Sequence, residues 1–192
     1  MNTIINHSLP KAYAAIEKET QKSGFTMASD TMACSFLRTM AATKPGGSFL
    51  ELGTGSGLST SWILDGMDEH STMISVDYDG ELLSIANKFL GNDSRLTLTL
   101  ADGEEWIKTH PNLEFDFIFA DTWHGKYLLL DEVLQMLRPG GLYLVDDMLP
   151  QSNWPEGHLE KATNLVKYLE RREDLVLTKL NWSSGLIVAA KK

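Results

Sequence analysis

The sequence is short of cysteine, of positive charge and of long apolar runs. Its single cysteine, Cys34, excludes a disulfide within these 192 residues and fits a reducing compartment, where we expect it to pack as a small apolar residue. Lys and Arg number 17 against 26 Asp and Glu, and the formal net charge of -9 argues against a nucleic-acid partner. No apolar run approaches the roughly 20 residues of a membrane helix, and the N-terminal segment lacks a secretory signal pattern. We therefore expect a cytoplasmic globular protein that binds neither nucleic acid nor membrane.

From residue 46 onward, apolar strand patterns alternate with helix patterns. The predicted strands span residues 48–52, 72–77, 96–101, 115–121, 142–147, 175–181 and 185–192. The predicted helices span residues 58–67, 80–90, 103–110, 126–137 and 156–173, the fourth ending at a turn with the sequence RPGG. This order predicts an α/β fold, a Rossmann-like doubly wound and mostly parallel sheet with helices on both faces, in which the last two strands pair antiparallel.

We expect a single domain over residues 1–192. Residues 46–192 would form its core. Two amphipathic patterns at 10–24 and 29–43 predict helices within residues 1–45, which would either cover the site as a lid or form the surface of a homodimer.

Acidic residues recur where the predicted parallel strands end. They are Glu51, Asp77, Asp102, Asp121 and the pair Asp146 and Asp147. One such carboxylate is often only a helix cap, but five successive strand ends are harder to explain by capping alone. Because ligands of such sheets bind at the carboxyl ends of the strands, this edge is the predicted site.

The segment FLELGTGSGLSTSWI, residues 49–63, predicts a ligand-binding loop between a strand and a helix. It lacks the Lys of a triphosphate-binding loop, and Leu58 stands where a dinucleotide-binding loop has its third glycine. Glu51 would sit badly beside a pyrophosphate but could face an ammonium or a sulfonium, and Asp77 is placed to accept the ribose hydroxyls of an adenosine. The pattern favours S-adenosylmethionine over NAD, with a nicotinamide oxidoreductase as the disfavoured alternative.

Five segments together resemble a known family: the loop above, ISVDYDGELLSIA, LADGEEW, FIFADTWHGKY and LRPGGLYLVDDM. In order and spacing they match the motifs of class I S-adenosylmethionine-dependent methyltransferases, and more narrowly the catechol and caffeoyl-CoA O-methyltransferases. The resemblance implies a seven-stranded sheet with an antiparallel last strand. It also implies transfer of a methyl group to the oxygen of a small molecule, a phenol being one candidate.

The resemblance assigns cofactor roles residue by residue. The glycine loop would approach the methionine part, Asp77 would hold the ribose, and Tyr78 would lie against the adenine. The full set of implied cofactor-binding residues is Glu51, Gly53, Thr54, Gly55, Gly57, Ser59, Asp77, Tyr78, Asp102, Gly103, Asp121 and Trp123.

The resemblance also implies a Mg²⁺ site at Asp121, Asp146 and Asp147. Asp147 departs from the family, which has Asn there, and the alternative is that it caps a turn and no metal binds. His124 aligns with the catalytic Lys of the catechol enzyme and is the candidate base beside Asp121 and Asp146, with Lys126 as its substitute. A metal-free N- or C-methyltransferase and a non-catalytic S-adenosyl-ligand-binding protein remain alternatives.

Overall fold

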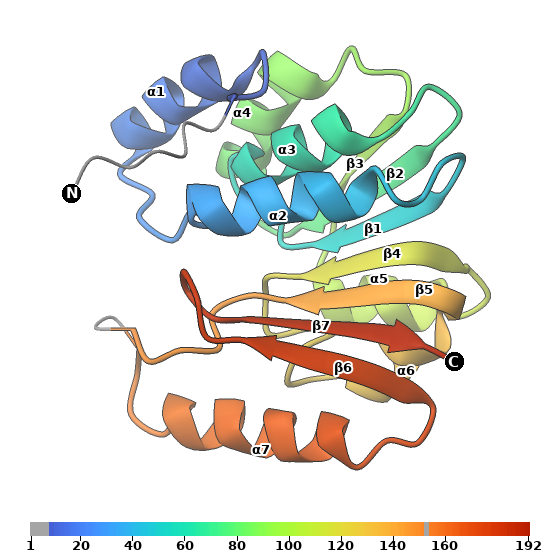
Figure 1. The fold of residues 1–192 in the computed structure, drawn as a ribbon. Coiled ribbons are helices and arrows are strands. Elements are labelled where there is room, and N and C mark those ends of the chain that lie inside the picture. Colours follow the sequence, from blue (N-terminus) through green and yellow to red (C-terminus); the bar gives the residue numbers. More distant parts are fainter. Residues whose placement is uncertain (1–7, 152–153) are drawn as a thin grey trace.

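A seven-stranded sheet runs through the computed structural model, which describes residues 8–151 and 154–192 (Figure 1). The strand order is β3-β2-β1-β4-β5-β7-β6, and β3 through β5 pair in parallel. β7 lies between β5 and β6 and is antiparallel to both. The strands are β1 (Ser48–Leu52), β2 (Thr72–Asp77), β3 (Leu96–Leu100), β4 (Phe115–Ala120), β5 (Leu137–Val145), β6 (Leu175–Leu180) and β7 (Leu186–Lys191). The predicted fold class and the antiparallel last strand are confirmed.

Helices cover both faces of this sheet. On one face lie α1 (Tyr13–Ser23), α2 (Thr31–Ala41), α3 (Leu58–Gly66) and α4 (Gly80–Leu90). On the other lie α5 (Gly103–Thr109), α6 (Leu130–Gln135) and α7 (His158–Glu170). Three of these helices begin at an aspartate whose carboxylate accepts a backbone N–H of the first turn, and these caps are Asp30, Asp79 and Asp102.

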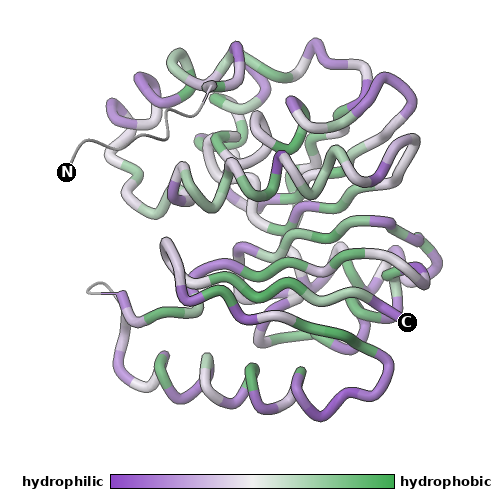
Figure 2. The backbone as a smooth tube through the Cα atoms, viewed as in Figure 1, coloured by the Kyte–Doolittle hydropathy of each residue, from purple (hydrophilic) through white to green (hydrophobic). Residues whose placement is uncertain are grey.

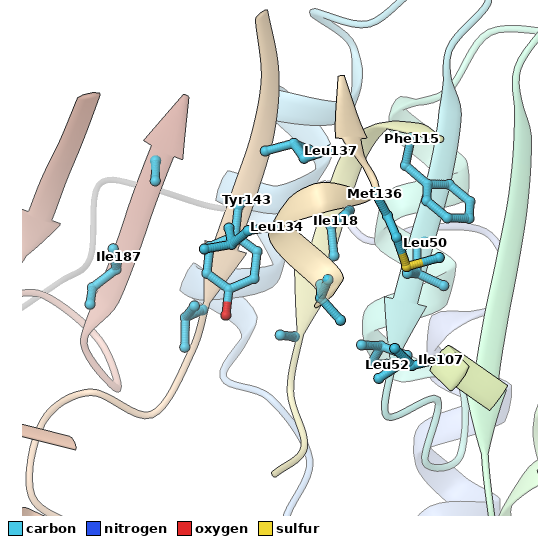
Figure 3. Packing of buried hydrophobic residues seen from close by; sticks show 14 of the residues in the cluster. Leu50, Leu52, Ile107, Phe115, Ile118, Leu134, Met136, Leu137, Tyr143 and Ile187 are labelled. Atoms are coloured by element: carbon cyan, nitrogen blue, oxygen red, sulfur yellow. The ribbon is translucent and has the colours of Figure 1, made fainter. Parts of the chain in front are cut away.

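The two-residue period of the strands divides the core into two apolar layers. In β4, Ile118 packs with α5–α7, whereas Phe117 and Phe119 pack with α1–α4. Figure 3 shows the first layer, in which side chains of β1, β4 and β5 meet those of α5 and α6. Hydrophobic residues run along the strands, and hydrophilic residues alternate with hydrophobic ones along α7 (Figure 2).

The prediction of a helix at 126–137 is wrong at both ends, because α6 spans only Leu130–Gln135. Gly125 and Leu128 form a turn, with the Leu128 carbonyl accepting the Gly125 N–H at 2.7 Å, and α6 begins only at Leu130. The RPGG sequence lies within β5 rather than outside it. The register of β5 against β4 shifts between Phe115 and Phe117, so the Pro and Gly residues occupy an irregular stretch of the strand where a missing N–H is tolerated.

The helix α2 and the aspartate that caps it contact the turn between β6 and β7. The Ser183 hydroxyl, in the turn between β6 and β7, donates to the Asp30 carboxylate at 2.5 Å, and Trp182 packs edge-on against Phe36 of α2. Among the described residues, no helix has the length and hydropathy that crossing a membrane requires.

Candidate active site

A cavity of about 660 Å³ opens at the carboxyl ends of β1, β2, β4 and β5, the edge that the sequence predicts. Its size is that of a pocket for a small molecule or cofactor. The glycine loop after β1 and the end of β2 form one wall, and the segment after β4 forms another. Residues 25–30, between α1 and α2, also line the cavity, as do residues after β5 and at the start of α7. The connection between the N-terminal helices therefore contributes directly to the site.

The glycine loop is held close to the ends of β2 and β4. Gly53 has a φ of +103°, and a Cβ there would lie 2.9 Å from the backbone oxygen of Asp121. The Gly55 N–H donates to the Asp77 carboxylate at 2.7 Å, and its φ is +51°. Both positions need glycine, because their backbone conformation is left-handed and, at Gly53, no side chain would fit.

Gly57 starts α3 and fixes the loop against α4. Its φ is +91°, and a Cβ would lie 2.9 Å from that of Ala86. Gly57 is not part of the cavity lining, packing between α3 and α4 accounts for a glycine at this position, and its contact with a cofactor stays a prediction.

Glu51 lies beneath the loop, fully buried and outside the cavity lining. Its carboxylate accepts hydrogen bonds from the hydroxyls of Ser59, Thr60 and Ser75 at 2.6–2.7 Å. Burial raises the pKa of this carboxyl from its ordinary value of 4.5 to about 7, although the three hydroxyl donors act in the opposite direction. Glu51 therefore supports the loop from below through these three hydroxyls, and its contact with a cofactor stays a prediction.

The two acids at the ends of β2 and β3 differ in position. Asp77 lines the cavity, as does the largely exposed Tyr78. Asp102 does not, and its carboxylate caps α5 by accepting the N–H groups of Glu104 and Glu105. Asp102 thus caps a helix while its neighbour Gly103 lines the cavity, and the cofactor contact of Asp102 stays a prediction.

His124 lies against the α5 side of the cavity. A Cβ on Gly103 would come within 2.8 Å of the His124 ring, so the glycine makes room for the imidazole. His124 and Trp123 both line the cavity.

The three candidate metal ligands lie near one another but face different partners. Asp121 lines the cavity and accepts the Ser29 hydroxyl at 2.7 Å, and its pKa is raised by burial and by the charge of Asp146. Asp146 is buried, and one of its oxygens accepts both the Ser184 hydroxyl and the Asp147 N–H. Its pKa is raised to about 6, mainly by burial.

The described residues contain no group of three or more His, Cys, Asp or Glu side chains arranged to hold a metal ion. The Mg²⁺ set implied by the resemblance does not fit this arrangement, because its three carboxylates do not converge as such a group and one oxygen of Asp146 accepts two internal hydrogen bonds. Asp147 lines the cavity with a left-handed backbone, φ +55°.

Lys126 lies among these carboxylates, with only 5% of the residue exposed. Its Nζ donates to the backbone oxygen of Asp146 at 2.6 Å. Burial lowers its pKa, while the charges of Asp121, Asp147 and Asp146 oppose that shift. A cationic side chain of the protein thus occupies the acidic end of the cavity.

Aromatic rings around His158 line the cavity on the same side as Lys126, whose Nζ lies 5.1 Å from the centre of the Tyr127 ring, and the sequence did not predict this cluster. The His158 ring lies 4.3 Å from that of Trp154 and meets Tyr127 edge-on, and the Tyr127 hydroxyl hydrogen-bonds to its Nε2 at 3.1 Å. The buried His158 Nδ1 has no hydrogen-bond partner among the described residues. Burial lowers the His158 pKa, which favours a neutral ring. A lone histidine at a predicted helix start carries no signal that distinguishes it from a surface residue.

Most of the predicted site residues therefore surround a single cavity. Those that line it are Gly53, Thr54, Gly55, Ser59, Asp77, Tyr78, Gly103, Asp121, Trp123, His124, Lys126 and Asp147. Those outside its lining are Glu51, Gly57, Asp102 and Asp146.

Comparisons with solved structures identify the same architecture elsewhere. The O-methyltransferase TomG of Streptomyces achromogenes, solved with S-adenosylmethionine, superposes with a TM-score of 0.82 at 15% identity, covering 98% of this chain and 92% of that one. An O-methyltransferase of Bacillus cereus, solved with S-adenosylhomocysteine, has a TM-score of 0.82 at 18% identity, covering 100% of this chain and 94% of the other. At these identities the likeness shows the fold.

Sequence comparison places the chain in a family. A Mycobacterium avium (strain 104) protein named "Putative O-methyltransferase" is 28% identical over 107 residues, 52% of this chain and 47% of that protein. The chain thus spans about half the length of the curated relatives that it matches. The sequence model of a family described as "Methyltransferase domain" matches residues 50–148, from β1 to just past β5. Since this match covers half of the chain, including the glycine loop and the acids after β4 and β5, the protein belongs to that methyltransferase-domain family.

Proposed function

We propose that the protein transfers a methyl group from S-adenosylmethionine to a hydroxyl oxygen of a small molecule. The observation that carries this proposal is the division of one cavity into two ends. The glycine loop and Asp77 form one end, and Lys126 and the aromatic rings around His158 form the other. A cofactor and an acceptor bound in one cavity would meet between them, as direct transfer requires.

The negatively charged lining of the cavity suits a cationic cofactor without phosphate groups. Five aspartates line the cavity: Asp30, Asp77, Asp79, Asp121 and Asp147. They would attract the sulfonium of S-adenosylmethionine and repel the pyrophosphate of NAD. Gly53 and Gly55 have no side chain where they line the cavity, so a ligand can approach the main chain there.

In the proposed reaction, S-adenosylmethionine supplies an electrophilic methyl group, the acceptor oxygen bonds to it, and the carbon–sulfur bond breaks. The acceptor's proton must pass to a base. We assign this role to Asp121, because it lines the cavity beside Lys126, between the glycine loop and the aromatic end. His124 is the alternative base, although its ring lies at the α5 wall against Gly103.

Two binding measurements test the cofactor. Calorimetric titration should detect binding of S-adenosylhomocysteine and no comparable binding of NAD. The opposite pattern would overturn the proposal.

Turnover is tested with radiolabelled S-adenosylmethionine and a panel of phenols, aliphatic alcohols and amines. Transfer to hydroxyl compounds supports the proposed reaction, whereas transfer only to amines would favour the N-methyltransferase alternative. Binding of S-adenosylhomocysteine without turnover on any acceptor would favour the non-catalytic alternative. Asp121→Asn should lower kcat with little change in S-adenosylhomocysteine affinity, and His124→Asn should lower it less.

A cytoplasmic location and a homodimer are separate proposals. The buried free thiol of Cys34 is compatible with a reducing compartment. The exposed surfaces of α1 and α2 are the proposed dimer contact, and sedimentation equilibrium would test it.

A further inference from the structure

We propose that the ammonium group of Lys126 takes the place of a divalent cation in this site, so that the protein binds no metal there. The part of the inference that concerns the acceptor rests on the proposed function. The part that concerns metal binding does not.

The position of Lys126 is the first argument. It belongs to the segment between β4 and α6, and its side chain turns inward to the end of β5, where Nζ meets the backbone oxygen of Asp146 at 2.6 Å. With 5% of the residue exposed, its charge is held in place rather than solvated. A second cation placed beside it would meet strong repulsion, because the interaction between charges is little screened in a buried site.

The state of Asp146 is the second argument. Its Oδ1 accepts from the Asp147 N–H at 2.7 Å and from the Ser184 hydroxyl. The Ser184 bond joins the residue after β5 to the turn between β6 and β7, so turning Oδ1 toward an ion would break that contact. Coordination of a metal ion through Oδ1 would thus disrupt the fold locally.

The ammonium group of Lys126 can also donate hydrogen bonds to a ligand. A protonated lysine has three N–H donors, and Lys126 commits one to Asp146. The remaining two are available at the cavity wall, since Lys126 contributes to its lining. Donated to the acceptor oxygen, they would stabilise its deprotonated form, which is the electrostatic help that a metal ion gives in other enzymes.

Metal binding tests the inference without reference to activity. The purified wild-type protein, treated with EDTA and dialysed, is titrated with MgCl₂, MnCl₂ and CaCl₂ by calorimetry and thermal unfolding. We expect no saturable binding and no shift of Tm. Stoichiometric Mg²⁺ binding that disappears in Asp121→Asn would overturn the proposal, and this measurement needs no lysine variant to fold.

Lys126→Met then removes the internal cation while keeping an unbranched side chain. We expect this variant to gain a Mg²⁺-dependent rise in Tm, whereas Lys88→Met, at an exposed lysine paired with Glu19 on the surface, should not. A Lys126→Met protein that folds and shows no such gain would contradict the view that Lys126 occupies the cation's place.

Activity tests the acceptor part. With an acceptor identified, wild-type turnover should be unchanged by EDTA, and Lys126→Met should lower kcat by about 100-fold, the size typical of one removed electrostatic donor. Its pH–rate profile should move to higher pH, with S-adenosylhomocysteine affinity unchanged. EDTA-sensitive wild-type turnover, restored by Mg²⁺, would refute the inference. If no acceptor is methylated, the proposed function fails, and the metal titration still decides the role of Lys126.

Discussion

The carboxylate of Asp77, at the end of β2, accepts the N–H of Gly55 in the glycine loop at 2.7 Å. Its other oxygen accepts the Asp79 N–H at 2.9 Å. One side chain thus fixes the loop and the first residues before α4. Asp77→Ala should weaken S-adenosylhomocysteine binding by roughly 10- to 100-fold, because hydrogen bonds to a charged group contribute about 1.5–3 kcal/mol. Calorimetry would measure the loss.

Asp102→Ala is the matched control for that variant. Asp102 also follows a strand and accepts two backbone N–H groups, but it lies outside the cavity lining. Loss of this cap should cost about 1 kcal/mol of stability with unchanged ligand affinity. Equal losses of affinity in the two variants would show that Asp102 contacts the cofactor after all.

Glu51 should make stability depend on pH. Its pKa in the folded protein is about 7, above the ordinary 4.5, so the folded state binds an additional proton between these values. The contribution of Glu51 is therefore most favourable below about pH 4.5 and declines by roughly 3 kcal/mol as pH rises through 7. In Glu51→Gln this decline should disappear, since a neutral amide can stay bonded to the hydroxyls around it.

Urea unfolding of both proteins at several pH values between 4.5 and 8 would measure that difference. Other titrating groups contribute equally to the two curves, so the difference isolates Glu51. Parallel curves would mean that Glu51 is ionised throughout the range.

Gly57→Ala should destabilise the protein more than Gly24→Ala. Both glycines have positive φ, +91° and +77°, but only a Cβ at Gly57 meets a neighbour, Ala86 at 2.9 Å. Backbone strain alone should cost about 1–2 kcal/mol at Gly24, with about 1–3 kcal/mol more from overpacking at Gly57. Thermal unfolding would compare them, and equal losses would argue that α4 moves freely to accommodate the methyl group.

Tyr127→Phe should affect the acceptor rather than the cofactor. It removes the hydroxyl that bonds to His158 and leaves both ring nitrogens without a partner among the described residues. The KM for the acceptor should rise about tenfold, in line with about 1–2 kcal/mol for a lost buried hydrogen bond, with S-adenosylhomocysteine affinity unchanged. Tyr168→Phe on the outer face of α7, where the hydroxyl bonds to Asp131, is the control and should leave KM unchanged.

Local signals in the sequence predicted much of the fold. The helix expected at 80–90 matches α4 residue for residue, and in the structure the Asp79 carboxylate caps its start. The pairing of the last two strands is also confirmed. Where a Pro and two glycines suggested a turn, the chain forms an irregular stretch of β5 instead, since parallel pairing with β4 continues on both sides of it.

The environment of individual side chains was less accessible to sequence reasoning. Glu51 and Ser75 are partners in the register of β1 and β2, and local sequence patterns did not predict the hydrogen bond that this long-range pairing gives Glu51. The sequence predicted a helix that begins at Lys126. In the structure Lys126 instead lies in the turn closed by the Gly125 N–H and the Leu128 carbonyl, and its side chain is buried. The partners of His158 lie at least 31 residues away in the chain, apart from Trp154, so no local pattern could assemble them.

The turn between β6 and β7 sets the order in which the site can be completed. Ser183 bonds to Asp30 and Ser184 bonds to Asp146, so this one turn holds both the segment before α2 and the acid after β5. Translation delivers these serines after all of the strands β1 through β5. A nascent chain could assemble β1 through β5 on the ribosome, yet it would expose an unfinished cavity until that turn emerged. Ligand capture during synthesis should therefore begin only after residue 184 has left the exit tunnel.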